Sequence, residues 1–517
     1  MRALPRRAHG PAAVIACLLC ACATSQLKRA PRAPDVAWKP ASNDPHDFSL
    51  PPEPSLPLHT EEIATTKPDR VYTLADLIDI AESANPDTRS GWEQARQAAL
   101  AVGIAKAEYL PVISALALTG YRHYSFPLAN ISSQSLTVTP EVLPGIGVPL
   151  APITQTSGHV GVDTINFFPL LAIKWQIIDF GRGPTVDAAE RASDASNAAF
   201  TAKHQQVVFD VTRAYLRLSA ARAQTAVARD ALDRTRAIAK GAEERYAQGI
   251  ATTVEVTEAR REVASAEYNV VQAEAAETTV YTALLSTMGV DPVLRLNIAS
   301  NPSRELPAQL EGEVRAFVQS ALKTRPDLQA ALSQRSSAQA LISKSQSAFL
   351  PRLSIVGTGG AAILSAKADG GSFSTTTIPN VGALLNFEWL LFDGGIRDAQ
   401  AEIARSRRNE AERELEKLQR DATQQVVNAY NEVNASLARY RAALSLEKTA
   451  SVAEDATSKS YANGLSTFTD VNSAQKAHSL ASAAKEQAFA EALISATTLT
   501  FASGQLGSAK AVPTLRH

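Results

Sequence analysis

The feature that most restricts the fold of this chain is a run of 68 residues, Ile396 to Asn463, without glycine or proline. These two residues are the strongest helix breakers, so the run predicts one continuous helix. At 1.5 Å per residue such a helix is about 100 Å long. An ordinary globular domain does not contain a helix of this length, so the chain has to be built from elongated elements.

An internal duplication organises the chain. The recurring pairs are Asn85-Pro86-Asp87 with Arg325-Pro326-Asp327, Leu110-Pro111 with Leu350-Pro351, Trp175 with Trp389, Asp179 with Asp393, Gly181 with Gly395, Val211 with Val426 and Tyr215 with Tyr430. The first two pairs are 240 residues apart and the others 214 or 215. The first repeat therefore carries a longer insertion, around residues 132–158, whose Ser, Thr, Pro and Gly content predicts an exposed loop.

Each repeat follows one plan. A helix of about 20 residues runs up to the Leu-Pro pair, two strands separated by a polar loop follow, and a very long helix then turns into a return helix. We expect the polar loops between Phe126 and Gly158 and between Ser365 and Asn380. Apolar residues of the long helices alternate in steps of three and four, which indicates a coiled-coil seam. These positions are Val208, Val211, Tyr215 and Leu218, and Val426, Tyr430, Val433, Leu437, Tyr440 and Leu444.

The seam alone fits a soluble coiled-coil rod, but the strands favour a membrane. Apolar side chains alternate with polar ones in the second strand of each repeat, as in a barrel with lipid outside and water inside. The expected lipid face is made of Leu171, Ile173, Trp175, Ile177, Leu385, Phe387 and Trp389. The same pattern also fits a half-buried strand of a soluble sheet. One chain offers only about four such strands, so a membrane barrel would have to be shared among chains.

Composition excludes several classes of protein. The formal net charge is -1, which gives no reason to expect nucleic acid as a partner, because a basic footprint would be needed. All three cysteines lie between Cys17 and Cys22, which excludes a disulfide scaffold and a cysteine-ligated zinc site in the body. The eight histidines are scattered without ligand spacing, so we expect no metal and no cofactor.

The N-terminus predicts export. Basic residues precede a short apolar run from Ala12 to Ala23, which is typical of a secretory signal. Its end, Leu19-Cys20-Ala21-Cys22, resembles the bacterial lipobox, and we expect lipidation of Cys22 after cleavage behind Ala21. An ordinary signal peptide with a chance cysteine is the alternative. The expected divisions are a signal peptide (1–21), a Pro-rich tether (22–70), a first repeat (71–289), a connector (290–312), a second repeat (313–507) and a C-terminal tail (508–517).

The tips of the two helical hairpins carry the most telling repeat. Tyr246-x-x-Gly249-x5-Glu255-Val256 returns as Tyr461-x-x-Gly464-x5-Asp470-Val471. Each glycine can take the left-handed conformation that ends a helix. Thr252 with Glu255, and Thr467 with Asp470, can form capping boxes for the return helices.

Together, the duplicated motifs between residues 71 and 507 resemble the TolC family of outer-membrane efflux proteins, and the lipobox resembles its lipid-anchored branch. The resemblance implies a mainly α fold with a small β part, built from a duplicated helix–β-hairpin–long helix repeat. It implies a homotrimer, with a trimeric α-helical barrel and a shared 12-stranded transmembrane β-barrel. Residues 290–312 would form an equatorial region.

The resemblance also implies a function without catalysis. The chain would be the outer-membrane exit duct of a tripartite efflux system, extending into the periplasm and working with a periplasmic adaptor protein and an inner-membrane pump. The tips would form the gate and dock the adaptor, with Glu255 linked to Tyr461 and Asp470 in an acidic ring. Capping alone is the alternative role for both acids. Two alternative functions remain: the duct of a type I protein secretion system, and a pore-less lipid-anchored scaffold.

Overall fold

The computed structural model describes residues 33, 35–36, 70–129, 137–138, 148–149, 157–300, 305–368 and 371–506. The predicted signal peptide, Cys22, most of the tether and the C-terminal tail lie outside these residues. No helix within the described ranges is long and apolar enough to cross a membrane.

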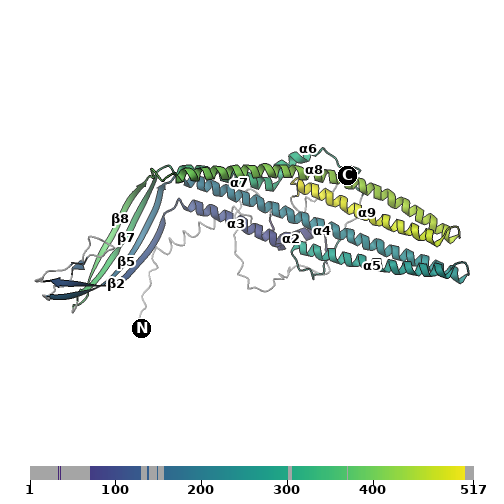
Figure 1. Ribbon diagram of the computed structural model, residues 1–517, viewed down its shortest axis with the longest axis horizontal. Helices are drawn as coiled ribbons and strands as arrows, with labels where there is room; N and C mark the ends of the chain where they lie inside the picture. Colours follow the sequence, from purple (N-terminus) through teal and green to yellow (C-terminus); the bar gives the residue numbers. More distant parts are fainter. Residues whose placement is uncertain are drawn as a thin grey trace, which may run out of the picture. The chain divides into compact units, whose positions relative to one another are not determined.

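The helices confirm the duplication (Figure 1). Each repeat contains a short helix, a helix of 22 residues, a very long helix and a return helix. In the first repeat these are α2 (Leu74–Ala84), α3 (Pro86–Ala107), α4 (Arg182–Ala247) and α5 (Thr253–Met288), and in the second α6 (Val314–Thr324), α7 (Pro326–Ser347), α8 (Ile396–Ala462) and α9 (Phe468–Ala502). The 67 residues of α8 confirm the predicted continuous helix, whereas α2 and α6 were not predicted.

Local sequence explains where the shorter helices begin. Pro86 and Pro326 occupy the first positions of α3 and α7, where the missing backbone donor costs nothing. Thr73 caps α2 in a complete capping box, because its backbone N–H also donates to the Asp76 carboxylate at 2.8 Å.

Four long strands form one antiparallel sheet, in the order β2 (Val112–Ala129), β5 (Ser157–Ile178), β7 (Arg352–Ala368) and β8 (Ser374–Glu388). Two short ladders accompany it: β1 (Val71–Tyr72) pairs in parallel with β6 (Asn297–Ile298), and β3 (Thr137–Val138) pairs with β4 (Val148–Pro149). The four predicted strands are confirmed.

The turn between β7 and β8 is shorter than expected. The sequence predicts a loop between Ser365 and Asn380, but pairing of the two strands continues to Ala366 with Ser374. The polar residues that indicated a loop belong to the strands instead. For example, the hydroxyls of Ser365 and Thr375 lie 2.8 Å apart across the two strands. Threonines also favour strands because they are β-branched.

The register places the expected apolar residues of both repeats on the same face of the sheet. Trp175 of β5 lies opposite Ile355 of β7, and Ile355 lies opposite Leu385 of β8. Residues directly opposite each other share a face, so the expected apolar faces of β5 and β8 are continuous through β7. Trp389 follows directly after the last residue of β8.

One glycine allows the two repeats to approach within the sheet. A Cβ atom on Gly360 would lie 2.2 Å from the carbonyl oxygen of Pro169. At the neighbouring Gly359 a Cβ atom would meet nothing within 4 Å. Gly360 is therefore required by close packing of β7 on β5, whereas Gly359 is not.

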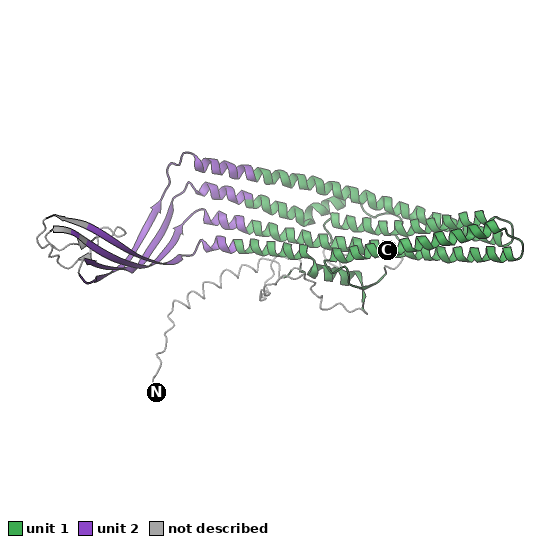
Figure 2. Cartoon of the chain, turned by 60° about the horizontal axis from the view of Figure 1, so that its bottom comes forward, with its two compact units in different colours: residues 1–101, 190–337, 408–517 green, residues 102–189, 338–407 purple. Residues whose placement is uncertain are grey.

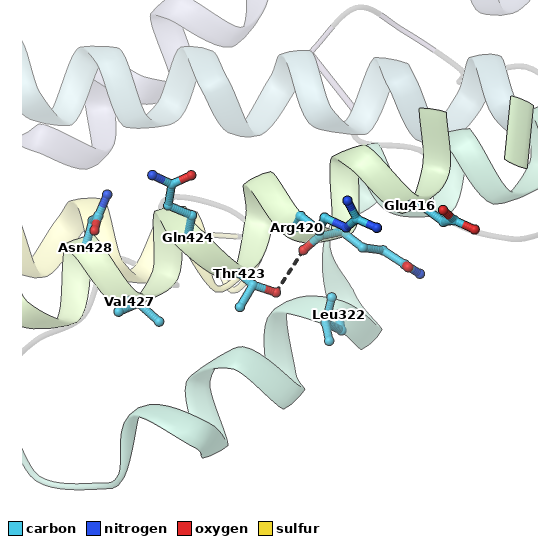
Figure 3. Close-up of a pocket in the computed structure, with 8 residues that line it drawn as sticks. Leu322, Glu416, Arg420, Thr423, Gln424, Val427 and Asn428 are labelled. Atoms are coloured by element: carbon cyan, nitrogen blue, oxygen red, sulfur yellow. Dashed lines mark hydrogen bonds between the residues drawn. The ribbon is translucent and has the colours of Figure 1, made fainter. Parts of the chain in front are cut away.

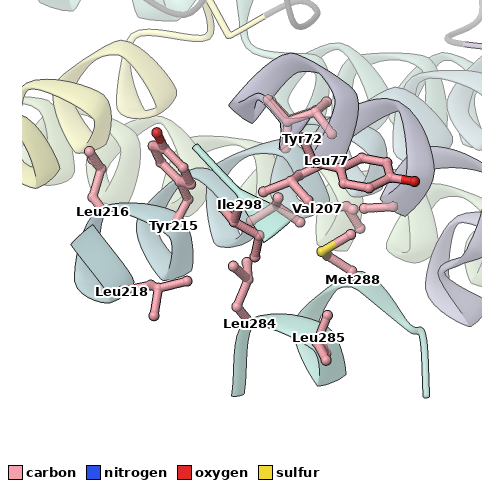
Figure 4. Close-up of a cluster of buried hydrophobic side chains, with 14 of the residues drawn as sticks. Tyr72, Leu77, Val207, Tyr215, Leu216, Leu218, Leu284, Leu285, Met288 and Ile298 are labelled. Carbon is pink, nitrogen blue, oxygen red and sulfur yellow. The ribbon is translucent and has the colours of Figure 1, made fainter. Parts of the chain in front are cut away.

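The described residues divide into two compact units, each discussed by itself (Figure 2). Unit 1 draws on the described residues within 1–101, 190–337 and 408–517, and unit 2 on those within 102–189 and 338–407. The core of unit 1 collects side chains from α2, α4, α5 and β6 (Figure 4). Its fully buried members include Leu77, Val208, Val211, Leu284 and Met288.

The predicted seam is confirmed along most of its length. In α8, Val426, Val433 and Leu437 are buried against α9 and α6 residues such as Leu499 and Ala321. The seam ends earlier than its pattern, since Leu444 is 38% exposed.

Candidate functional site: the linked hairpin tips

The backbone has the same conformation at the two hairpin tips. Gly249 (φ 74°) and Gly464 (φ 76°) adopt the left-handed conformation that ends α4 and α8. The N–H of Ile250 donates to the Arg245 carbonyl at 2.9 Å, and the N–H of Leu465 makes the equivalent bond at 2.8 Å. Both helices therefore end in the same glycine-based motif, as the sequence predicts.

The second tip completes its capping box. Asp470 N–H donates to the Thr467 hydroxyl at 3.2 Å, while the Asp470 carboxylate accepts from the backbone N–H of Thr467 at 2.9 Å. The bonds from the Thr467 side chain and backbone lower the pKa of Asp470 below its usual value. The predicted capping role of Asp470 is confirmed.

The first tip uses its acid differently. Thr252 still accepts from the Glu255 N–H at 3.2 Å, so half of the predicted box is present. The Glu255 carboxylate, however, accepts a hydrogen bond from the Tyr461 hydroxyl at the end of α8. The structure thus places the first-hairpin acid and the second-hairpin tyrosine in direct contact, as expected.

Tyr461 is enclosed where the two hairpins meet. It is 7% exposed and packs with Ala242, Phe468 and Val471. Burial first, and then the bond to Glu255, raise the pKa of Tyr461 to about 12. The phenol therefore stays protonated at neutral pH and can keep donating to Glu255.

Arg245 is a further contact that the sequence analysis missed. Its guanidinium lies 4.6 Å from the centre of the Tyr461 ring and donates to the Tyr461 carbonyl at 2.6 Å. Such stacking adds to the hydrogen bond in holding the two hairpins together. Nothing in the spacing of the repeats indicates this residue, because its partner lies 216 residues away.

Tyr246, the duplicate of Tyr461, has a different environment. It is 49% exposed, and its hydroxyl accepts from Thr253 of its own hairpin at 3.4 Å. Apolar side chains around the turns are also exposed, among them Ile250 (63%), Val254 (77%) and Leu465 (81%). An exposed apolar end of this kind is typical of a surface that meets a partner.

A pair of arginines, also missed, fastens the strands to the long helices in unit 2. Arg182 donates to the carbonyls of Gln176 (2.8 Å) and Ile177 (2.7 Å), and its guanidinium lies 4.6 Å from the Tyr109 ring centre. Arg397 likewise donates to the Leu390 carbonyl and stacks on Phe349. The corresponding distances are 2.7 Å and 4.8 Å. Both guanidinium groups are nearly buried, so the duplicated clamp fixes the junctions.

The sequence contains both arginines, but their spacing from the preceding glycine differs by one residue between the repeats. Gly181 is followed directly by Arg182, whereas Ile396 separates Gly395 from Arg397. The offset between the repeats changes from 214 to 215 at this inserted residue. Aligning the glycines therefore hides the matching arginines.

The expected lipid face is exposed in the described sheet. Leu171, Ile173, Trp175 and Ile177 are 38–47% exposed; Leu385, Phe387 and Trp389 are 54–67% exposed. The indole N–H of Trp175 donates to the Tyr109 carbonyl at 3.0 Å, and that of Trp389 to the Phe349 carbonyl at 3.1 Å. Both tryptophans thus have a satisfied polar end and an exposed apolar ring, as aromatic residues have at membrane interfaces.

Away from the tips, an open groove runs between α6 and α8 (Figure 3). Leu322 comes from α6, and the rest of the lining comes from α8. These α8 residues are Glu416, Gln419, Arg420, Thr423, Gln424, Val427 and Asn428. The groove brings together no pair of groups suited to nucleophilic or acid–base chemistry. The described residues also contain no cluster of three metal-binding side chains.

A solved structure shares this architecture. The outer-membrane channel OprN is 17% identical in sequence and superposes with a TM-score of 0.64, covering 90% of this chain and 99% of that chain. The chain therefore has the fold of the outer-membrane channel OprN.

Sequence comparison identifies the family. The sequence model of the family described as outer membrane efflux protein matches residues 155–290 and 317–505, more than half of the chain. This chain therefore belongs to the outer membrane efflux protein family, and its place is the outer membrane.

Two curated relatives agree with this assignment. Protein CyaE of Bordetella pertussis is 24% identical over 381 residues, which cover 73% of this chain and 72% of CyaE. Outer membrane protein OprJ of Pseudomonas aeruginosa is 26% identical over 253 residues, covering 48% of this chain and 51% of OprJ.

Proposed function

We propose that this protein is the passive exit duct of a tripartite efflux system, and that its hairpin tips form the gate. The observation that carries the proposal is the contact between Tyr461 of one hairpin and Glu255 of the other. A partly buried contact between two long hairpins can hold them together, and breaking it lets them separate. The duct itself needs no catalytic group, since the pump supplies the energy.

The open edges of the sheet support a trimeric assembly. In the four-stranded order, β2 and β8 each have one neighbour only. Unpaired strand edges are not tolerated in lipid, and four strands are too few to close a barrel. Three chains would make a closed barrel of 12 strands, with the expected lipid face outward. The exposed apolar turns at the tips suit docking of a periplasmic adaptor, which connects the duct to an inner-membrane pump.

The lipid anchor is a separate proposal. Cys22 stands at the end of the signal, where the lipobox places the modified cysteine. Labelling cells with radioactive palmitate should mark the wild-type chain and not the Cys22→Ala variant. Equal labelling of both chains would exclude Cys22 as the anchor.

Conductance tests the duct. The purified full chain should have a mass near three times that of one subunit and conduct ions in planar bilayers. A correctly folded trimer without conductance would contradict the proposal and favour a pore-less scaffold.

The cargo needs a test in cells. Deleting the gene should make cells more sensitive to toxic small molecules if the duct serves an efflux pump. If small-molecule tolerance stays unchanged and a secreted protein disappears from the medium, the protein is the duct of a secretion system instead.

A further inference from the structure

A partly buried charged cluster joins the two hairpins at a second level, apart from the tip, with its arginine 38% exposed. It consists of Arg234 on α4, Glu454 on α8 and His478 on α9. Arg234 Nη1 lies 2.6 Å from Glu454 Oε2 and 2.7 Å from His478 Nδ1, and His478 Nδ1 also contacts Glu454. The side chains of Glu454 and His478 are 10% and 8% exposed.

The cluster is distinct from the contact at the tip. Glu454 precedes Tyr461 by seven residues in α8. Two helical turns place it about 10 Å further from the end of the hairpin. Arg234 belongs to the first hairpin, whereas Glu454 and His478 both belong to the second. The bonds of Arg234 therefore cross between the hairpins, and the bond between Glu454 and His478 does not.

One nitrogen cannot satisfy both of its neighbours at once. Glu447 Oε1 lies 3.9 Å from His478 Nε2 and favours the neutral tautomer with its proton on Nε2, in which Nδ1 accepts from Arg234 but has no proton to offer Glu454. A protonated His478 donates from Nδ1 to Glu454 and repels the Arg234 guanidinium. The proton therefore decides whether His478 bonds to the first hairpin or only within the second.

The surrounding charges favour this exchange. On the α8 side, Glu447 Oε1 lies 3.9 Å from His478 Nε2, so a protonated ring would bridge two carboxylates. On the α4 side, Arg234 has a second partner in Asp230 at 2.7 Å, which can retain it when Glu454 is lost. Within α9, Lys485 lies 3.5 Å from Glu447 and balances that acid.

We propose that Arg234, Glu454 and His478 form a second lock between the hairpins, which protonation of His478 releases. The proposal rests on the proposed function, since the lock matters only if separated hairpins open the duct. At neutral pH Arg234 bonds across the hairpins to both partners. As the pH falls, protonated His478 donates to Glu454 and repels the Arg234 guanidinium, so the bonds of Arg234 to the second hairpin weaken while the contact at the tip remains.

Conductance as a function of pH tests the lock. The wild-type open probability in planar bilayers should be higher at about pH 5.5 than at about pH 7.5. His478→Gln keeps an acceptor for Arg234 but cannot be charged, so its open probability should stay low in acid. His204→Gln is the matched control, because His204 is equally buried but faces Glu82 of its own repeat. An acid response retained in His478→Gln would overturn the proposal.

Removing the arginine should open the lock at neutral pH. Bonds to charged groups are worth enough that losing one shifts such an equilibrium about tenfold or more. Arg234→Gln should therefore raise the open probability at pH 7.5 by at least this factor. Arg229→Gln is the control, because Arg229 lies on the same helix but pairs at 2.6 Å with Glu274 of its own hairpin. Equal effects of the two variants would count against the lock.

A distance measurement tests the lock between the hairpins independently of the proposed duct function. Spin labels on ketone-bearing amino acids in place of Asp233 (α4) and Val452 (α8), both well exposed, report the spacing of the hairpins. Acid should widen this distance in the wild type and not in His478→Gln. Widening without any conductance would support the lock and contradict the duct. Conductance without acid-dependent widening would support the duct and overturn the lock.

Discussion

At the scale of residues, duplication has produced matching positions with different tasks. Glu255 and Asp470 follow equivalent threonines, yet only Asp470 completes a capping box. Tyr461 is buried against Glu255, while its duplicate Tyr246 lies half exposed. The contact between the repeats thus uses the acid of one tip and the tyrosine of the other. The sequence indicates which residues are paired by duplication but not which member crosses to the other hairpin.

Removal of one hydroxyl should weaken the tip contact. Tyr461→Phe leaves the ring and its stacking on Arg245 but deprives the Glu255 carboxylate of its donor. We expect a leakier pore, with the single-channel conductance of the purified variant above that of wild type. Tyr246→Phe is the matched control and should conduct like the wild type, since its hydroxyl contacts only its own hairpin. Unchanged conductance in Tyr461→Phe would exclude a gating role for the bond.

The tip contact should also resist alkali. The pKa of Tyr461 is raised from 10.0 to about 12, so its contribution to stability is fully present below pH 10. It is lost only as the pH rises through about 12. Ultraviolet difference spectra should therefore show a late-ionising tyrosine that disappears in Tyr461→Phe. If the variant titrates with the same profile as the wild type, Tyr461 does not have the raised pKa.

At the scale of elements, one close approach fixes how the strands of the two repeats pair. Pro169 in β5 has no backbone donor, and Gly360 in β7 supplies the space for its carbonyl. This pair lies where β5 of the first repeat meets β7 of the second repeat. The sheet therefore depends on one glycine more than on its neighbours.

Two adjacent glycines allow a direct test of this dependence. Gly360→Ala forces a methyl group against the Pro169 backbone and should destabilise the folded chain by about 1–3 kcal/mol, as overpacking commonly does. Gly359→Ala meets open space and should change the stability little. Thermal unfolding followed by circular dichroism measures both. Equal melting temperatures for the two variants would contradict the packing seen here.

Sequence reasoning recovered the elements better than their contacts. The absence of glycine and proline predicted α8 almost to the residue, and alternation predicted the four strands. The short helices α2 and α6 were not predicted, because each has only 11 residues and is separated by one residue from the proline that begins the next helix. The bonds of Arg234 and Arg245 to the second hairpin could not be predicted, because they join residues more than 200 positions apart with no pattern linking them.

At the scale of the whole molecule, the exposed apolar face of the sheet has to be buried against lipid or another chain. Seven large apolar side chains of this face remain at least 38% exposed in the single chain. Burying such a surface in lipid is favourable, whereas leaving it in water promotes aggregation. The sheet is thus incomplete as a separate subunit, and assembly and membrane insertion belong together.

Tryptophan fluorescence can locate this face. In vesicles whose lipids carry brominated acyl chains, the emission of Trp175 and Trp389 should be quenched, since both rings are exposed on the apolar face. Trp92 lies in α3 and stacks with Arg96 at 4.7 Å, so its emission should not change. Variants with a single remaining tryptophan separate the signals. Quenching of Trp92 and not of Trp175 would place the lipid elsewhere.

The near-equal lengths of the duplicated helices have a consequence for stoichiometry. The helices α4 and α8 contain 66 and 67 residues, and α5 and α9 contain 36 and 35. A difference of one residue is about 1.5 Å of rise, so a trimer would present six tips at nearly one depth. An adaptor that recognises the shape of the glycine turn would meet six equivalent sites on a pseudo-sixfold ring. One that recognises the exposed Tyr246 would meet only three.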